Sequence, residues 1–193
     1  MQVICFGDSN TYGYDPRSYL GGRYGPRDRW VDLLAAETGW AVRNWGANGR
    51  TIPAAMPPLP PDTDLLVVML GTNDLLQGRG PEEAAGRLEQ LLAGVRLPRD
   101  HLLLIAPPPL ARGAWVRDAA LIGASRAFAR CCRTLAERLG IHFADAGAWV
   151  VPLAYDGVHF TEQGHRAFAA GLLGALGRGA PASDNGFQKG RAE

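Results

Sequence analysis

The 193-residue sequence has no excess of basic residues and no long apolar run. Its 20 Lys and Arg against 19 Asp and Glu give a formal net charge of +1 at pH 7. Proteins that bind nucleic acids or anionic membrane surfaces usually carry a clear basic excess. A transmembrane helix needs about twenty apolar residues in succession, and a signal peptide needs a basic segment before an apolar one. We therefore expect no nucleic-acid partner, no membrane association and a cytoplasmic location.

Cysteine is also scarce. The chain has three cysteines, Cys5 and the adjacent pair Cys131 and Cys132. An odd number with one adjacent pair is not the pattern of a disulfide framework, so we expect these thiols to be buried as small apolar side chains. The hydrophobic share of 47% supplies enough apolar side chains for a full core, and 25 Gly and 14 Pro predict many turns.

Short apolar runs alternate with segments of helical periodicity along the chain. Strands are expected over residues 2–6, 41–45, 65–70, 101–106 and 141–144. Helices are expected over 30–38, from Pro81, over 121–139 and after Thr161, whose hydroxyl can cap the last helix. This alternation predicts one α/β domain with a parallel sheet, spanning residues 1–176. Residues 177–193 show no periodicity and predict a flexible tail.

Polar segments follow four of the five expected strands. They are residues 7–11, 46–51, 71–74 and, across a loop, 156–159. The active crevice of such a sheet lies at the carboxyl ends of its strands. We therefore expect a hydroxyl, glycine-flanked amides, a carboxamide, a carboxylate and an imidazole to meet at one edge.

This set of groups suits acyl transfer. A serine hydroxyl such as that of Ser9 is a poor nucleophile until a base removes its proton, and His159 can do so near neutral pH. Asp156, three residues earlier, can orient that imidazole and stabilise its charged form. The tetrahedral intermediate needs donors directed at its oxygen, and the candidates are the backbone N–H groups of Ser9 and Gly49 and the side-chain amide of Asn73.

Each of these residues also has a structural interpretation when it is taken alone. Ser9 could cap a helix, Gly49 could simply allow a turn, and Asn73 could cap the segment that follows it. A single histidine is more often a surface or core residue than a catalytic one. We interpret His101 and His142 as structural and His165 as exposed or as a support for the site, but the four elements in this order favour catalysis.

The chain resembles the SGNH hydrolases, also called the GDSL esterases and lipases. Their four sequence blocks occur in order over residues 6–164. The first block reads Phe-Gly-Asp-Ser-Asn, with Asn10 where the family name has leucine, and we expect this departure to adjust the pocket without removing the chemistry. The second block places the oxyanion glycine at Gly49, with Gly46 as a nearby rival. The third block contains Asn73, and the fourth runs from Asp156 to His159.

The resemblance implies a flavodoxin-like, three-layer α/β/α fold with five parallel strands. It also implies serine esterase chemistry without a metal or an organic cofactor. Within the family, the segments Gly-Asp-Ser-Asn-Thr-Tyr-Gly-Tyr-Asp-Pro and Ala-Pro-Pro-Pro-Leu look like the small bacterial arylesterase and acyltransferase branch, whose members often form homo-oligomers. We expect hydrolysis of small aryl or short-chain acyl esters through an acyl-serine, with transfer to alcohols, by a homo-oligomer. A carbohydrate O-acetyl esterase is the alternative.

Two interpretations outside this family compete. Oxygen-rich side chains could form a divalent-metal site for a phosphoester, namely those of Asp8, Asn73, Asp74, Asp156 and His159. A non-catalytic flavodoxin-like domain could hold an anion. The chain, however, has neither the phosphate-binding motif Gly-x-x-x-x-Gly-Lys-Ser/Thr nor the motif Gly-x-Gly-x-x-Gly after its first expected strand. The Gly-x-Ser-x-Gly elbow of the α/β-hydrolases is absent as well.

The walls of a substrate pocket are expected from three segments, residues 11–27, 107–115 and 150–155. Their candidate lining aromatics are Tyr12, Tyr14, Trp115 and Trp149, although core packing explains any one of them equally well.

Overall fold

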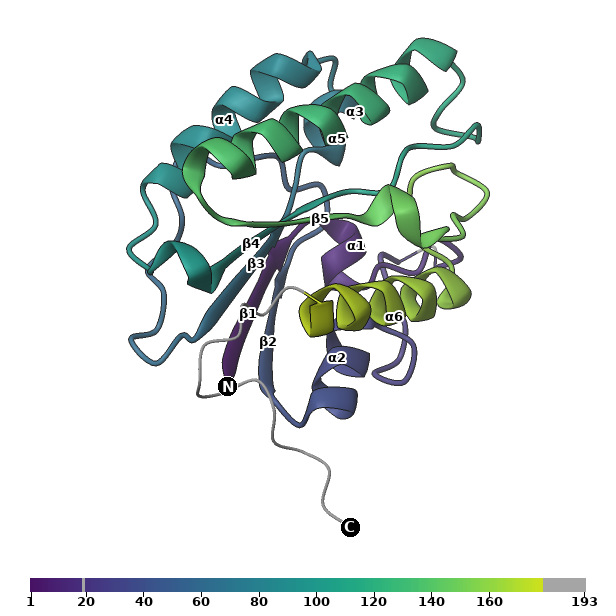
Figure 1. Cartoon of the computed structure of the whole chain (residues 1–193). Coiled ribbons are helices and arrows are strands. Elements are labelled where there is room, and N and C mark those ends of the chain that lie inside the picture. The colour runs from purple at the N-terminus through teal and green to yellow at the C-terminus, as the bar shows by residue number, and fades with distance from the viewer. Residues whose placement is uncertain (19, 179–193) are drawn as a thin grey trace.

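Five parallel strands form one central sheet (Figure 1), seen in a computed structural model that describes residues 1–18 and 20–178. The strands are β1 (Gln2–Gly7), β2 (Ala41–Gly46), β3 (Leu65–Met69), β4 (Leu102–Ala106) and β5 (His142–Asp145). Their order in the sheet is β2-β1-β3-β4-β5. The connection after β1 therefore runs toward one edge of the sheet, and the connection after β3 runs toward the opposite edge. In open α/β sheets ligands bind at such a reversal, which here lies between the carboxyl ends of β1 and β3.

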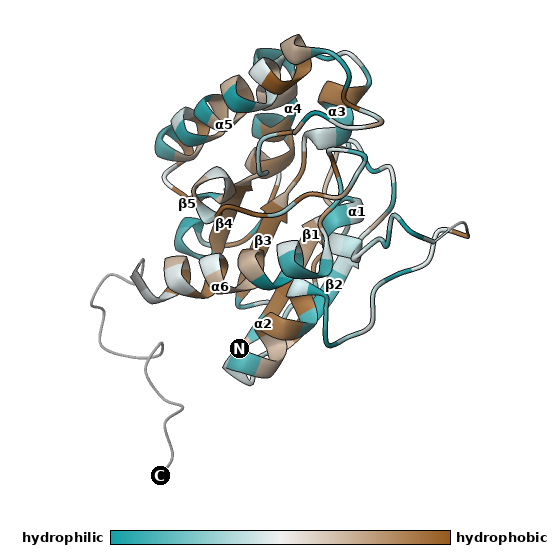
Figure 2. Ribbon diagram, turned by 90° about the vertical axis from the view of Figure 1, so that its right-hand side faces the viewer, coloured by the Kyte–Doolittle hydropathy of each residue, from teal (hydrophilic) through white to brown (hydrophobic). Residues whose placement is uncertain are grey.

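Helices cover both faces of the sheet (Figure 2). On one face lie α3 (Thr72–Leu76), α4 (Pro81–Ala93) and α5 (Ala119–Leu139), and on the other lie α2 (Trp30–Thr38) and α6 (Glu162–Arg178). Alternate residues of a strand point to opposite faces, so Ile4 and Phe6 pack in the first layer while Val3 and Cys5 pack in the second. All residues of β3 and β4 are buried, as the continuous apolar runs predict.

The helix signals in the sequence correspond to real helix ends. Asp118 precedes α5 and its side chain accepts a hydrogen bond from the Ala120 N–H, while Gly140 ends the helix in the left-handed region. At the start of α6, the Thr161 hydroxyl accepts the Gly164 N–H at 2.9 Å, which confirms the expected cap. Within the described residues, no helix is long and apolar enough to cross a membrane.

Some boundaries differ from the expectation. His101 belongs to a short 3-10 turn, η1 (Arg99–His101), and β5 begins at His142, one residue later than expected. The helix α6 continues to Arg178, and the rest of the expected tail lies outside the described residues. The short helices α1 (Ser9–Tyr12) and α3 had no periodic signal, because a single turn is too short to show one. All three cysteines are free; Cys5 and Cys132 are buried and Cys131 is partly buried.

Candidate active site

Ser9 is the first residue of α1, and only Asp8 separates it from the end of β1. The residue that caps this helix is Asp8, whose carboxylate accepts the Asn10 N–H at 3.0 Å. The structural interpretation of Ser9 as the cap is therefore wrong, and its hydroxyl is available for another partner. Its backbone N–H lies at the start of the helix and has no acceptor among the described residues.

The partner of the Ser9 hydroxyl is a histidine 150 residues away in sequence. Ser9 Oγ lies 3.0 Å from His159 Nε2, and His159 Nδ1 lies 2.7 Å from Asp156 Oδ2. When Nδ1–H donates to the carboxylate, Nε2 is the acceptor for the serine hydroxyl. All three side chains are buried. The structure thus brings together the three residues that sequence reasoning selected as nucleophile, base and orienting acid.

The carboxylate of Asp156 is held in its charged form. Burial by itself raises the pKa of Asp156, but hydrogen bonds from the His159 ring and from two backbone N–H groups outweigh burial and lower this pKa below its ordinary value. Those backbone donors are the N–H groups of Val158 and His159, at 2.8 and 2.9 Å from Oδ1. A charged carboxylate at Nδ1 is what an imidazole needs in order to take up a proton at Nε2.

The turn that carries Asp156 is braced by the segment 111–116. Gly157 has a φ of +80°, and a Cβ there would come within 2.1 Å of the Ala111 carbonyl oxygen. The close approach allows the Ala111 N–H to donate to the Gly157 carbonyl and the Trp115 N–H to donate to the Asp156 carbonyl. The same segment places the Trp115 ring edge-on to the His159 ring, with centroids 5.1 Å apart.

The oxyanion candidates lie on two further loops. Gly49 has a φ of +69°, and its N–H has no acceptor among the described residues. The rival Gly46 donates its N–H to the Asn44 side chain, so that donor is already occupied. Asn73 lies in the first turn of α3 and donates to the Arg50 carbonyl at 3.0 Å. This bond places Asn73 beside residues 47–52, the Gly49 loop. The Arg50 guanidinium in turn donates to the Gly7 carbonyl at 2.9 Å, two residues before Ser9.

A family model for GDSL-like lipases and acylhydrolases matches residues 5–167. The chain belongs to this family. A carbohydrate acetylesterase family member from Sinorhizobium meliloti is 27% identical, with a TM-score of 0.76 over 91% of this chain and 96% of that one. The native M. smegmatis aryl esterase is 28% identical, with a TM-score of 0.76 over 91% and 97%. A candidate arylesterase from Agrobacterium tumefaciens is 32% identical, with a TM-score of 0.74 over 91% and 97%.

A search of curated protein sequences finds no match. Membership of the GDSL family confirms the resemblance seen in the sequence, and with it the three-layer fold and the classification as an enzyme of the esterase type.

Asp74 has a different task from the metal binding that sequence reasoning considered for it. Its side chain is fully buried and accepts the Ile52 N–H at 2.9 Å. Arg79 and Arg87 lie 3.3 and 3.8 Å from its other oxygen. Asp74 therefore anchors the end of the Gly49 loop. Within residues 1–18 and 20–178, no group of three His, Cys, Asp or Glu side chains is arranged to hold a metal ion.

Of the two alternatives expected for His165, exposure is wrong, because the residue is fully buried. Burial, together with electrostatic interactions with Arg29 and His159, lowers the pKa of His165 to about 3. Its ring lies against Tyr24 and Phe160, and its Nδ1 accepts the Trp30 N–H at 3.4 Å. The side chain is thus a neutral acceptor at the start of α2.

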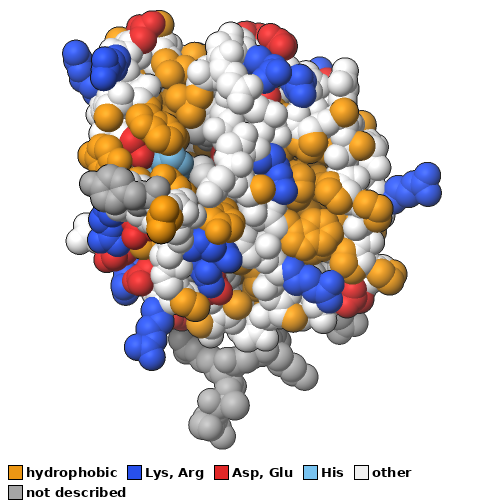
Figure 3. All heavy atoms as spheres, turned by 180° about the vertical axis from the view of Figure 1, so that it is seen from behind, with side chains coloured by type: hydrophobic (Ala, Val, Ile, Leu, Met, Phe, Trp, Pro, Cys, Tyr) orange, Lys and Arg blue, Asp and Glu red, His pale blue; other side chains and the backbone are white. Residues whose placement is uncertain are grey.

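Two of the four aromatic residues expected to line a substrate pocket lie beside His159. The Tyr14 ring centroid is 4.6 Å from that of His159, and Trp115, whose side chain is 55% exposed, borders the same ring. Tyr12 instead stacks with the Arg23 guanidinium, and Trp149 packs against Phe168 in the core. On the face shown in Figure 3, hydrophobic side chains gather into patches with a histidine visible between them.

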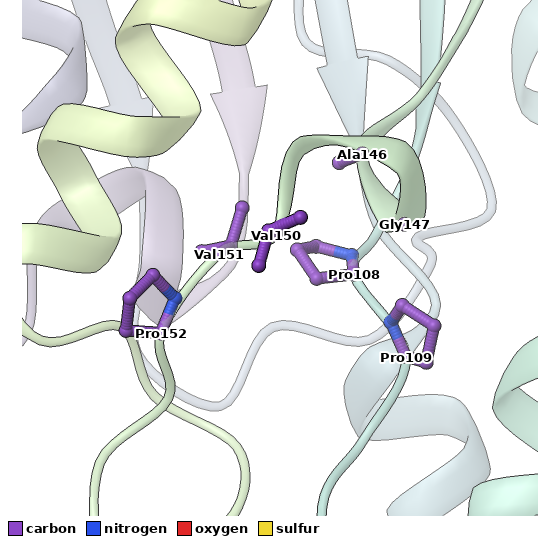
Figure 4. A pocket seen from close by; sticks show the side chains of 7 residues that line it. All are labelled: Pro108, Pro109, Ala146, Gly147, Val150, Val151 and Pro152. Carbon is purple, nitrogen blue, oxygen red and sulfur yellow. The ribbon is translucent and has the colours of Figure 1, made fainter.

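A separate cavity of about 220 Å³ lies at the ends of β4 and β5 (Figure 4). It is lined by Pro108, Pro109, Ala146, Gly147, Val150, Val151 and Pro152. Two of the three expected wall segments thus contribute to it, but none of its lining side chains carries a charge or a hydroxyl. Ser9, Asp156 and His159 do not line it, so this cavity is not the place of the chemistry.

Replacing Asp8 with Asn is expected to change how stability depends on pH. Burial raises the pKa of Asp8 to about 6 from 3.8, so at intermediate pH the native protein keeps a proton that the unfolded chain has lost. This contribution to stability is complete below the unfolded pKa and is lost as the pH rises through about 6. The loss amounts to about 1–3 kcal/mol, at about 1.4 kcal/mol per pKa unit.

The Asn side chain keeps an oxygen for the Asn10 N–H but does not titrate. Urea unfolding of both proteins between about pH 4 and pH 8 measures the effect. We expect the free energy of unfolding of Asp8→Asn, relative to the unsubstituted protein, to rise over this range. A difference that stays constant with pH would contradict the assignment of a raised pKa to Asp8.

Proposed function

We propose that the protein is a serine esterase in which Ser9 is the nucleophile, His159 the general base and Asp156 the residue that orients it. The observation that carries this proposal is the unbroken chain of hydrogen bonds from Ser9 Oγ to His159 and on to Asp156, at 3.0 and 2.7 Å. No step of this chemistry needs a group from outside the chain apart from substrate and water.

Acylation begins when Ser9 Oγ attacks the ester carbonyl carbon and its proton passes to His159 Nε2. The C–O bond to the alcohol then breaks, and His159 returns the proton to the leaving oxygen. In the second half, water loses a proton to His159 as it attacks the acyl-serine, and the acid leaves when that proton reaches Ser9 Oγ. The developing oxyanion is stabilised by the Ser9 and Gly49 N–H groups and the Asn73 amide.

Replacing Asn73 with Ala is expected to lower kcat by roughly a hundredfold or more, the usual cost of one oxyanion donor. KM should change little, because the oxyanion exists only near the transition state. Steady-state kinetics on p-nitrophenyl acetate measure both constants. Asn44→Ala is a suitable control, since it removes a similar donor to a backbone carbonyl, that of Thr11 at 2.8 Å, and its effect on kcat should be far smaller. A change confined to KM would show that Asn73 holds substrate instead.

We further propose small aryl or short-chain acyl esters as substrates. The support is the pair of aromatic rings, Tyr14 and Trp115, that border His159 where the alcohol must leave, together with the similarity to the M. smegmatis aryl esterase. A planar leaving group can stack on such rings. The similar S. meliloti protein is a carbohydrate acetylesterase family member, and sugar O-acetates are therefore the second candidate class.

An ester panel tests this proposal. It combines phenyl and p-nitrophenyl esters of increasing acyl length with acetylated sugars, and a phosphonate that labels serine provides a check independent of substrate. Aryl acetates are expected to give the highest kcat/KM. If sugar acetates are preferred, the second class is correct, and if neither esters nor the phosphonate react, the catalytic assignment is wrong.

The same acyl-enzyme can be attacked by any nucleophile that reaches it. We propose that alcohols compete with water here, because apolar rings border the site, and that a homo-oligomer helps to enclose it. Product analysis with vinyl acetate and benzyl alcohol, alongside light scattering, tests both points. Formation of acetic acid alone across a wide range of alcohol concentrations would leave a plain hydrolase.

A further inference from the structure

Asn10, the residue after Ser9, is almost entirely buried, and its side chain reaches the segment that carries His159. Its Nδ2 donates to the Val158 carbonyl at 3.1 Å, and its Oδ1 accepts the Phe160 N–H at 2.9 Å. The two partners are the residues immediately before and after His159. Asn10 is 4% exposed, and Val158 and Phe160 are buried as well.

We infer that Asn10 is a positioning residue that fixes His159 relative to Ser9. The inference rests on the proposed function, since it concerns the distance between the nucleophile and its base. One carboxamide offers a donor and an acceptor side by side, and a peptide segment offers the complementary pair at residues two apart. A leucine at this position would fill a similar volume but would make neither bond.

The backbone around His159 shows why this link matters. The N–H groups of Val158 and His159 donate to Asp156, and the His159 carbonyl accepts the Ala154 N–H at 2.7 Å. These bonds hold the histidine within its own turn but do not connect it to the nucleophile. Apart from the Ser9 hydroxyl itself, the hydrogen bonds between α1 and residues 156–160 in the described structure are the two made by the Asn10 side chain.

Asn10 is itself held at both ends. Its N–H donates to the Asp8 carboxylate at 3.0 Å, and its carbonyl accepts the Trp30 Nε1–H at 3.0 Å. Because Asn10 is bonded covalently to Ser9, the rigid amide transmits the position of the nucleophile to the two residues that flank the base. A displacement of about 1 Å between reacting groups can cost roughly a hundredfold in rate.

The first test is Asn10→Leu. The substitution leaves the Val158 carbonyl and the Phe160 N–H buried without partners, so we expect kcat on p-nitrophenyl acetate to fall about 10- to 100-fold with little change in KM. Thr38→Val is the control for general loss of stability. It also removes one donor and one acceptor bond, to the Leu34 carbonyl and from the Trp40 N–H at the far end of α2, and its kcat should stay at the value of the unsubstituted protein.

The second variant, Asn10→Asp, keeps the shape of the side chain and guards against a failure of the leucine variant to fold. A protonated carboxyl can make both bonds, whereas a carboxylate loses the donor to the Val158 carbonyl. We therefore expect kcat of Asn10→Asp, divided by that of the unsubstituted protein, to decline as the pH rises. The corresponding ratio for Asn10→Leu should not depend on pH.

The ionisable groups on the elements that contact position 10 are present in both proteins. They are Asp8 on its own segment, Asp156 and His159 on the facing one, and Arg29 and Asp32 at the start of α2. Dividing by the activity of the unsubstituted protein therefore removes the titrations that the two proteins share, and any remaining pH dependence is caused by the new carboxyl.

The outcomes separate this inference from the proposed function. If the unsubstituted protein neither hydrolyses esters nor reacts with the phosphonate, the proposed function fails. If it is active and folded Asn10→Leu has an undiminished kcat, or the ratio for Asn10→Asp does not change with pH, the positioning role of Asn10 is wrong while the function stands. A fall in kcat for Asn10→Leu, an undiminished kcat for Thr38→Val and a pH-dependent ratio for Asn10→Asp support it.

Discussion

Replacing Ser9 with Ala is expected to abolish ester hydrolysis and to leave the protein folded. The Oγ atom forms the new bond to the substrate carbon, and no neighbouring group can take its place. Removing the nucleophile of such a unit lowers kcat by roughly a million-fold in serine proteases, and what remains comes from the oxyanion donors and from binding. We therefore expect a loss of about 10⁴-fold or more.

The fold should tolerate this change. Ser9 is 5% exposed, and its hydroxyl forms a hydrogen bond with His159, so the loss of stability should be about 1 kcal/mol or less. Ser125→Ala is a matched control, because Ser125 is also buried and its hydroxyl accepts the Leu110 N–H at 3.0 Å. It should lose stability and keep its kcat.

The measurement is kcat of purified protein on p-nitrophenyl acetate, with urea unfolding to confirm the fold and mass spectrometry after phosphonate treatment to locate the label. The label is expected on Ser9 in the unsubstituted protein and should be absent from Ser9→Ala. Full activity of a folded Ser9→Ala protein would overturn the mechanism.

The strands were predictable because their signal is local. The apolar run over 65–70 can be buried on both faces only in the centre of a sheet, and β3 lies there. The segment 119–139 repeats its apolar residues every three or four positions and is followed by a glycine. In the structure this segment is the helix α5, and the glycine ends it. The order of polar segments at strand ends likewise located Ser9, Asn73, Asp156 and His159, because parallel strands share one carboxyl edge.

What the sequence did not reveal depends on contacts between distant segments. The side chain of Asn10 bonds residues 148 and 150 positions away, and no local pattern specifies those partners. His165 lies on the helix face that packs against α2, so its burial depends on how the two helices meet. The positions of the aromatic candidates depend on distant contacts for the same reason. Trp149 packs against Phe168 in the core, whereas the segment 111–116 places Trp115 beside His159.

Replacing His159 with Ala should be nearly as severe as replacing Ser9. The two residues act as one unit, since the hydroxyl is a weak nucleophile without a base and the base has no task without the hydroxyl. The double variant Ser9→Ala/His159→Ala should therefore be no less active than either single one, which is the signature of groups that work together. Steady-state kinetics on p-nitrophenyl acetate, with the protein concentration corrected for the folded fraction, give the three values.

His165 provides the matched control for this experiment, as the other buried histidine of the described chain. His165→Asn keeps an oxygen that can accept the Trp30 N–H in place of Nδ1. Because the neutral ring of His165 packs between Tyr24 and Phe160 and does not contact Ser9, this variant should lose stability while the kcat of its folded fraction changes little. The reverse ranking, with His165→Asn inactive and His159→Ala active, would show that the wrong histidine has been assigned as the base.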